Sequence, residues 1–333
     1  MHYFRKRGWE LGDGAATPEA VFRTRRQLVK ALAAGPVLAA APVLLTACDG
    51  KESSNAANGA TASAADPSAH LYPVMRNLRY RVDGPLTEER HATTYNNFYE
   101  YGTSKYISQD AQQLRIRPWT VKIEGAVEKP FEIGIDDLLK KMPLEERVYR
   151  FRCVEAWGMT VPWSGFALKA LVDLAKPLSK AKYVRMETFG DSSLAPGLRQ
   201  PFFPWPYVEG LSMAEATNEL SFIATGLYGK PIPKQNGAPL RLVAPWKYGF
   251  KNVKSIVRIS FDEERPKTFW EKMGPAEYGF WANVNPEVAH PRWSQAHENV
   301  LGENRRAPTV IYNGYGEYVA GLYKGMENES LFK

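Results

Sequence analysis

The distribution of apolar and polar residues along the chain predicts strands joined by loops, with a few short helices. Strands are expected at residues 114–126, 147–154, 183–188, 221–227, 240–244 and 257–261. Apolar residues at helical spacing predict short helices at residues 135–142 and 166–174. We find no internal repeat, and 333 residues can form either one large domain or two.

The strand at residues 147–154 is the most informative of these elements. Alternation separates an apolar face, with Tyr149, Phe151 and Cys153, from a basic face, with Arg150 and Arg152. Cys153 therefore leaves the apolar face near the end of the strand, where a side chain is held rigidly and can open onto a cleft. A lone cysteine in a strand is commonly a buried structural residue, but the two neighbouring arginines favour a thiolate.

Two segments lack a regular period. Residues 91–102 are dense in aromatic and amide side chains, and we interpret them as a loop packed on the core. Such a loop is either a surface loop held by its aromatic residues or a ligand-binding loop. Residues 191–218 are rich in proline and predict a long loop of the kind that often forms a lid or a binding site.

Charge argues against nucleic-acid binding. The formal net charge is +7, but residues 1–47 hold seven Lys/Arg and three Asp/Glu, which leaves only +3 for the rest of the chain. One later segment, residues 230–254, carries cations and no acid: Lys230, Lys234, Arg241, Lys247, Lys251 and Lys254. Interleaved glycines make this segment either a solvated face or a cradle for a phosphate group.

The N-terminal residues predict export. Arg25 and Arg26 lie in a close match to the twin-arginine pattern, and the uncharged apolar run 31–47 suits a signal peptide better than a membrane-spanning helix. The twin-arginine route carries folded proteins and therefore suits those that load a cofactor before export. We expect a periplasmic protein with a signal peptide at residues 1–47.

Cys48 completes a lipobox-like sequence and is the only cysteine besides Cys153. A lipid on Cys48 would anchor the domain, while ordinary cleavage near Ala60 is the competing interpretation. Residues 48–71 are rich in Ala, Ser, Asn and Gly and predict a flexible linker. The folded domain is expected at residues 72–333.

Three motifs together resemble one known group of enzymes. They are NNFYE at residues 96–100, FRCVEAW at residues 151–157 and KQNGAPLR at residues 234–241. With these motifs the chain resembles the molybdopterin-binding sulfite-oxidase superfamily. Within it, the chain is most similar to the bacterial branch of periplasmic protein-methionine-sulfoxide reductases, over about residues 72–333. PWKYGFK at residues 245–251 and the stretch 285–295 also fit that branch.

The resemblance implies an α+β fold: a mixed, β-rich, sulfite-oxidase-type molybdopterin-binding domain. Sulfite oxidases proper carry a further C-terminal immunoglobulin-like dimerisation domain. Because the chain stops soon after Tyr323, we expect a single domain without that addition, acting as a monomeric catalytic subunit.

The resemblance also implies a Mo-molybdopterin cofactor, with one molybdenum per chain and Cys153 as its thiolate ligand and catalytic residue. The residues implied to bind the cofactor are Asn96, Tyr99, Glu100, Thr188, Asn236, Arg241, Asn252, Val253 and Lys254. Position 252 holds Asn where we expect Gly in this family, a change that matters only if the site needs a positive φ.

The implied reaction is the reduction of methionine sulfoxide in oxidised periplasmic proteins by oxygen-atom transfer. Electrons would come from a membrane haem-b subunit and the quinone pool, since this chain has no C-x-x-C-H haem motif. A protein substrate needs an open cleft, which we expect near Trp205, and Glu155 would either deliver a proton or form a salt bridge to a nearby arginine.

Three alternatives stay open. The chain could be an enzyme of the same fold that acts on another S- or N-oxide or on sulfite. It could be a lipid-anchored protein that binds an anion without redox chemistry. It could also be a thiol peroxidase that uses Cys153 directly.

Overall fold

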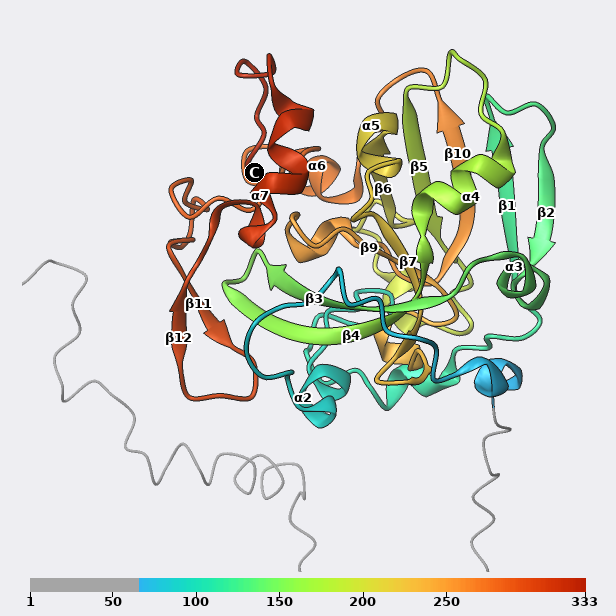
Figure 1. The fold of residues 1–333 in the computed structure, drawn as a ribbon, viewed down its shortest axis with the longest axis horizontal. Coiled ribbons are helices and arrows are strands. Elements are labelled where there is room, and N and C mark those ends of the chain that lie inside the picture. Colours follow the sequence, from blue (N-terminus) through green and yellow to red (C-terminus); the bar gives the residue numbers. More distant parts are fainter. Residues whose placement is uncertain (1–65) are drawn as a thin grey trace, which may run out of the picture. The chain divides into compact units, whose positions relative to one another are not determined.

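Two mixed β-sheets carry the fold of residues 66–333, the part of the chain that this computed structural model describes (Figure 1). The five-stranded sheet runs in the order β2 (Phe131–Gly134), β1 (Thr120–Gly125), β10 (Ile256–Asp262), β5 (Tyr183–Thr188) and β6 (Val208–Ser212). The seven-stranded sheet contains β12 (Arg306–Pro308), β11 (His297–Val300), β4 (Trp157–Ala167), β7 (Phe222–Leu227) and β8 (Lys230–Pro231), with β3 (Glu145–Cys153) paired to β4 and β9 (Arg241–Val243) paired to β7. The predicted signal peptide, the lipobox at Cys48 and most of the linker lie outside the described residues.

Short helices connect the strands. The α-helices are α2 (Glu89–Thr94), α3 (Ile135–Lys141), α4 (Leu168–Ala175), α5 (Met213–Ala216), α6 (Phe269–Met273) and α7 (Gly316–Val319). The 3-10 turns are η2 (Pro67–Leu71), η3 (Asp110–Gln113), η4 (Pro196–Arg199), η5 (Lys234–Asn236), η6 (Gly249–Lys251), η7 (Ile311–Gly314) and η8 (Ala320–Tyr323). In residues 66–333, every helix is too short or too polar to cross a bilayer.

Helix α4 illustrates how the sequence builds these elements. Leu168, Leu171, Val172 and Ala175 recur at spacings of three and four, so they share one face and are buried in the larger hydrophobic core. The helix ends where Lys176 takes a left-handed conformation with φ of 50°. The observed helix begins two residues after the expected start at residue 166, because strand β4 continues to Ala167.

The β3–β4 hairpin positions the predicted thiol. Its antiparallel register pairs Glu145 with Gly165 at one end and Cys153 with Trp157 at the other. A tight turn follows Cys153, closed by the hydrogen bond from the Ala156 N–H to the Cys153 carbonyl at 3.1 Å. Because the strand stops there, the Cys153 side chain lies at the end of the hairpin, on the apolar face that alternation predicts.

Most expected strands are present, and the differences have local causes. The strand expected at 114–126 begins only at Thr120, because Pro118 has no N–H to donate to a ladder. The expected loop 91–102 begins inside helix α2, and the expected loop 191–218 contains β6 and α5. The described fold already contains η2 from Pro67, ahead of the expected start at Tyr72.

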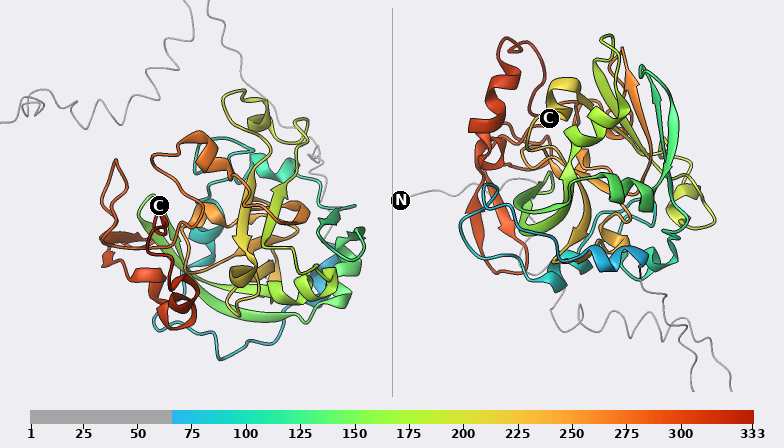
Figure 2. Two further views of the ribbon diagram at one scale, coloured as in Figure 1. Left: turned by 90° about the horizontal axis from the view of Figure 1, so that it is seen from above. Right: turned by 45° about the vertical axis from the view of Figure 1, so that its right-hand side comes forward.

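The segment from β11 to η8 completes the seven-stranded sheet. β11 pairs in parallel with the start of β4, next to the turn that follows Cys153. In the views of Figures 1 and 2 this segment, drawn in red, lies on the side opposite β1 and β2. The C-terminal third of the chain thus reaches the same turn as the β3–β4 hairpin.

Candidate active site

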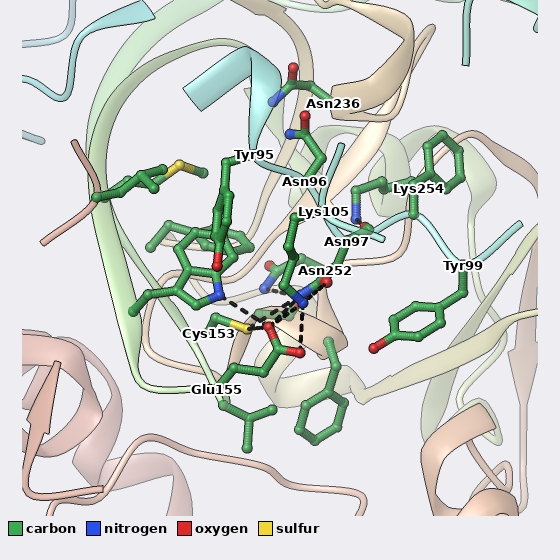
Figure 3. Close-up of a pocket in the computed structure, with 18 of the residues that line it drawn as sticks. Tyr95, Asn96, Asn97, Tyr99, Lys105, Cys153, Glu155, Asn236, Asn252 and Lys254 are labelled. Atoms are coloured by element: carbon green, nitrogen blue, oxygen red, sulfur yellow. Dashed lines mark hydrogen bonds and ion pairs between the residues drawn. The ribbon is translucent and has the colours of Figure 1, made fainter. Parts of the chain in front are cut away.

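A cavity of about 780 Å³ lies beside Cys153 and has a size typical of small-molecule sites (Figure 3). Its walls come from the loop after α2, the end of β3, residues 236–254 and the C-terminal third. Nine of the ten predicted site residues line it: Asn96, Tyr99, Glu100, Cys153, Asn236, Arg241, Asn252, Val253 and Lys254. The tenth, Thr188, is absent from the lining and donates its hydroxyl to the carbonyl of Lys254. The fold thus brings together residues that are far apart in the sequence.

The thiol of Cys153 is buried, with 4% of the residue exposed. Burial raises the pKa of this thiol to about 12, and the nearby Glu155 carboxylate adds to the rise. Arg152 acts in the expected direction and lowers this pKa, but burial outweighs its effect. Arg152 and Arg150 lie on the opposite face, where both pair with Glu298 at 3.0 and 2.6 Å. A bound metal ion would still deprotonate such a thiol, because metal coordination lowers thiol pKa values.

A polar cluster adjoins the sulfur (Figure 3). The amide nitrogen of Asn97 lies 3.6 Å from the sulfur and 3.0 Å from the Glu155 carboxylate, which also pairs with Lys105 at 2.6 Å. Burial alone would raise the pKa of Glu155, but hydrogen bonds from Asn97 and Lys105 outweigh burial and lower it. Glu155 thus forms the salt bridge that we considered, with Lys105 in place of an arginine.

Asn97 and Lys105 are site residues that the sequence did not single out. Asn97 lies within the NNFYE motif next to Asn96, and this position in the motif is the one sequence feature that could have identified it as a site residue. Lys105 stands alone in a polar loop, and no pattern distinguishes it from a solvated surface lysine.

The six cations of residues 230–254 do not act as one group. Lys230 pairs with Glu89 at the surface, and Lys234 donates to a backbone carbonyl. Lys247 and Lys251 are fully buried in ion pairs with Glu215 and Glu209 at 2.5 and 2.6 Å. Only Arg241 and Lys254 line the cavity. The interpretation of the whole segment as a phosphate cradle is therefore wrong, although two of its cations do face the cavity.

Arg241 is a buried cation that forms no ion pair with a carboxylate of residues 66–333. Its guanidinium donates only to the backbone carbonyls of Leu242, Asn236 and Asn252, at 3.0 to 3.2 Å. Burial lowers its pKa to about 9. A buried charge without a counter-ion is costly, so the cavity is suited to a ligand that carries negative charge.

Lys254 adds a second cation to the same wall of the cavity. Its ammonium donates to the carbonyl of Asn97 at 2.6 Å. Burial lowers the pKa of Lys254 and, next to it, raises the pKa of Glu100. Burial thus disfavours the charged form of both groups, while each of the two favours the charged form of the other.

Two amide oxygens in the cavity wall lack a partner. Asn96 and Asn236 both donate their amide nitrogens to the carbonyl of Ala92, at 3.2 and 2.9 Å. The oxygen of each amide is buried and accepts no hydrogen bond within the described residues. An unsatisfied buried acceptor typically costs about 1–3 kcal/mol, so these oxygens call for a ligand with hydrogen-bond donors.

The donor set of the cavity fits the implied cofactor. A pterin ring offers N–H donors that match the two amide oxygens, its phosphate matches the two cations, and a thiolate is a suitable ligand for a soft metal. In residues 66–333 no three His, Cys, Asp or Glu side chains are grouped to hold a metal on protein ligands alone.

Asn252 takes a role that does not require glycine. Its φ and ψ are −90° and 73°, outside the left-handed region, so no strain follows from a side chain there. The side-chain oxygen accepts the N–H of Ala244 at 2.5 Å, and the backbone carbonyl accepts Arg241. The Asn252 carbonyl thus helps to fix the orientation of the Arg241 guanidinium.

Aromatic side chains surround the outer part of the cavity. They are Tyr99, Phe250, Trp270, Tyr278 and Trp293, and exposed residues such as Arg292 and Asn299 also line it. Trp205 is absent from this lining and packs instead on Phe203 and Phe269, at ring-centroid distances of 5.3 and 5.1 Å. The loop near Trp205 therefore contributes Tyr207 to the cavity wall, while Trp205 itself packs into an aromatic cluster.

Comparison with known proteins agrees with the chemistry of the cavity. Residues 108–270 match the family model described as the oxidoreductase molybdopterin binding domain. The sulfane dehydrogenase SoxCD from Paracoccus pantotrophus is a similar solved structure, with 18% identity and a TM-score of 0.40 over 64% of this chain; the match spans 56% of that chain. The family match includes Cys153, Arg241 and Lys254, and it confirms the expected α+β, sheet-rich molybdopterin-binding fold. Residues 108–270 of this chain are thus similar to oxidoreductase molybdopterin-binding domains.

Proposed function

We propose that this protein reduces methionine sulfoxide in oxidised periplasmic proteins at a Cys153-ligated molybdopterin centre. The observation that carries the proposal is the buried Cys153 sulfur in a cavity that is also lined by Arg241, Lys254 and two unpartnered amide oxygens. The reaction consumes two electrons and two protons, and it converts the sulfoxide to the thioether and water. When bound, the cofactor supplies oxygen-atom transfer.

The residues around the cavity would hold and orient the cofactor. Asn96 and Asn236 would accept hydrogen bonds from the pterin, and Arg241 and Lys254 would neutralise its phosphate. All four groups come from rigid positions: the two asparagines share the Ala92 carbonyl, and Arg241 is fixed by three backbone carbonyls. Such preorganisation favours one bound orientation.

The polar cluster beside the sulfur suits a sulfoxide. The oxygen of a sulfoxide is a strong hydrogen-bond acceptor, and Lys105 offers N–H donors on the side of the cavity where the Cys153 sulfur lies. Glu155 pairs with the Lys105 ammonium and thereby orients its donors. These donors would bind the sulfoxide oxygen and stabilise negative charge on it.

The aromatic outer wall suits a methionine side chain. Sulfur makes favourable contacts with aromatic ring edges, and Phe250, Trp270 and Trp293 provide such rings. The exposed residues around them would let a side chain enter from the surface of another protein. A protein substrate, export through the twin-arginine route and electrons from a membrane haem-b subunit are parts of this proposal.

A second functional hypothesis, a binding protein without enzymatic activity, uses the same two cations. A non-redox anion-binding protein would use Arg241 and Lys254 but would not need the thiol of Cys153. A thiol peroxidase is less well supported, because a buried thiol of high pKa is a poor nucleophile.

A reduction assay tests the proposal. The metal-loaded protein, supplied with a reduced dye, should reduce a peroxide-oxidised, methionine-rich protein faster than it reduces free methionine sulfoxide or an N-oxide. Molybdenum content is measured in the same samples. Oxidation of sulfite, or turnover of small oxides alone, would favour the same-fold alternatives, and a metal-free protein that binds phosphate would favour the non-redox rival.

A further inference from the structure

Lys105, Asn97 and Glu155 form an arrangement whose geometry the cofactor pocket alone does not explain (Figure 3). The Lys105 ammonium contacts the side-chain oxygen of Asn97 and both Glu155 oxygens, at 2.7 Å and 2.6 Å for the latter. The Asn97 amide nitrogen faces the other way, toward Glu155 at 3.0 Å and the Cys153 sulfur at 3.6 Å. Lys105 thus touches the opposite end of the amide from the sulfur.

We propose that Lys105 is a positioning residue that holds the Asn97 amide with its N–H directed at the Cys153 sulfur. This inference rests on the proposed function, because it assigns the N–H to a thiolate that is bound to the metal. Nothing in the proposed pocket chemistry by itself requires this orientation.

Hydrogen-bonding capacity determines the orientation. An ammonium can only donate, and an ionised carboxylate can only accept. Asn97 lies against both, so its oxygen must face Lys105 and its nitrogen must face Glu155. A flipped amide would place its nitrogen against the ammonium and its oxygen against the carboxylate, and both contacts would be repulsive.

The surroundings make this preference strong. The Lys105 and Glu155 side chains are only 21% and 30% exposed, so water screens their charges weakly. The backbone of Asn97 is itself held, because its carbonyl accepts the Lys254 ammonium at 2.6 Å. Arg152, the cation on the neighbouring strand residue, is paired with Glu298 and cannot substitute for Lys105.

The orientation has an electronic consequence. A hydrogen bond donated to a thiolate ligand withdraws electron density from the sulfur and makes the metal easier to reduce. An amide oxygen turned toward the sulfur would act in the opposite direction. Lys105 should therefore raise the reduction potential of the bound centre through Asn97.

The test measures reduction potential and molybdenum content in the loaded protein. Lys105→Met should lower the midpoint potential, and Lys105→Arg, which keeps a cationic donor, should stay near the wild type. Asn97→Leu removes the N–H and should lower the potential as well. Lys230→Met, on an exposed lysine, is the matched control and should leave the potential unchanged.

The double variant distinguishes positioning from simple charge. If Lys105 acts through Asn97, Lys105→Met adds no further decrease in the Asn97→Leu background. Additive decreases, or an unchanged potential in Lys105→Met, would overturn the assignment. If Lys105→Met fails to load metal, Asn97→Asp decides: it cannot donate to the sulfur, so a wild-type potential in that variant would overturn the assignment. A wild-type protein that binds no molybdenum would instead overturn the proposed function.

Discussion

Arg241→Met should separate ligand binding from the stability of the empty protein. Arg241 is fully buried and forms no ion pair with a carboxylate of residues 66–333, and burial depresses its pKa to about 9. At about 1.4 kcal/mol per pKa unit, this depression corresponds to a cost of roughly 5 kcal/mol for holding the charge, which an anionic ligand would offset. Loss of one partner from a buried ion pair typically costs about 3–5 kcal/mol.

We therefore expect Arg241→Met to weaken cofactor binding by about 3 kcal/mol or more, roughly a hundredfold. The cofactor-free variant should change by only about 1–2 kcal/mol, because the lost hydrogen bonds to carbonyls are offset by removal of a buried charge. Urea unfolding of loaded and cofactor-free protein measures both quantities, since a ligand raises the free energy of unfolding by mass action.

Lys230→Met is the control for this experiment, because Lys230 lies in the same basic segment but is 64% exposed and pairs only with Glu89. It should leave the difference between loaded and cofactor-free protein unchanged. The reasoning is refuted if Arg241→Met keeps the same difference as the wild type.

Three further predictions concern the scaffold. Glu215→Gln leaves Lys247 buried without its counter-ion and should lower the free energy of unfolding by about 3–5 kcal/mol in urea titrations. Burial raises the pKa of Glu209 to about 7, so between about pH 4.5 and 7 the folded state holds a proton that the unfolded state has lost. The free energy of unfolding should therefore fall as the pH rises through this range. Glu209→Gln should make the free energy of unfolding less dependent on pH there. Gly197→Ala would place a methyl group 2.2 Å from the carbonyl of Tyr99, so it should displace the cavity loop and reduce molybdenum loading.

Matched variants check these three predictions. Asp173→Asn breaks the exposed pair with Lys169 and should change stability by less than about 0.5 kcal/mol, so an equal loss in Glu215→Gln would contradict the role of burial. Gly190→Ala meets no atom within 4 Å and should load metal normally. A Glu209→Gln protein with an unchanged pH profile would show that another group dominates that range.

Local patterns were sufficient for the strand that carries the thiol. Period-two alternation placed Cys153 on the apolar face, and the family resemblance implied nine residues that line one cavity. Both predictions use only residues that are close together in the sequence, so they can be made without knowing the tertiary fold. The same holds for helix α3, whose apolar spacing predicts its bounds closely.

Long-range pairing was not predictable from the sequence. Lys247 and Lys251 resemble Arg241 in the sequence, but acids brought in by α5 and β6 neutralise them. Arg241 pairs with no acid of the described residues. The arginines near Cys153 are likewise neutralised, by Glu298 of β11. Lys105 and the aromatic outer wall depend on loops that meet only in the folded chain.

The most direct test of the account is the molybdenum content of wild-type protein and Cys153→Ala, both purified from a host that makes molybdopterin. Because Cys153 is the single free thiol of residues 66–333, the account predicts one molybdenum per chain in the wild type and none in the variant, with both proteins folded to the same extent. Equal molybdenum in the two proteins, or none in the wild type, would contradict it.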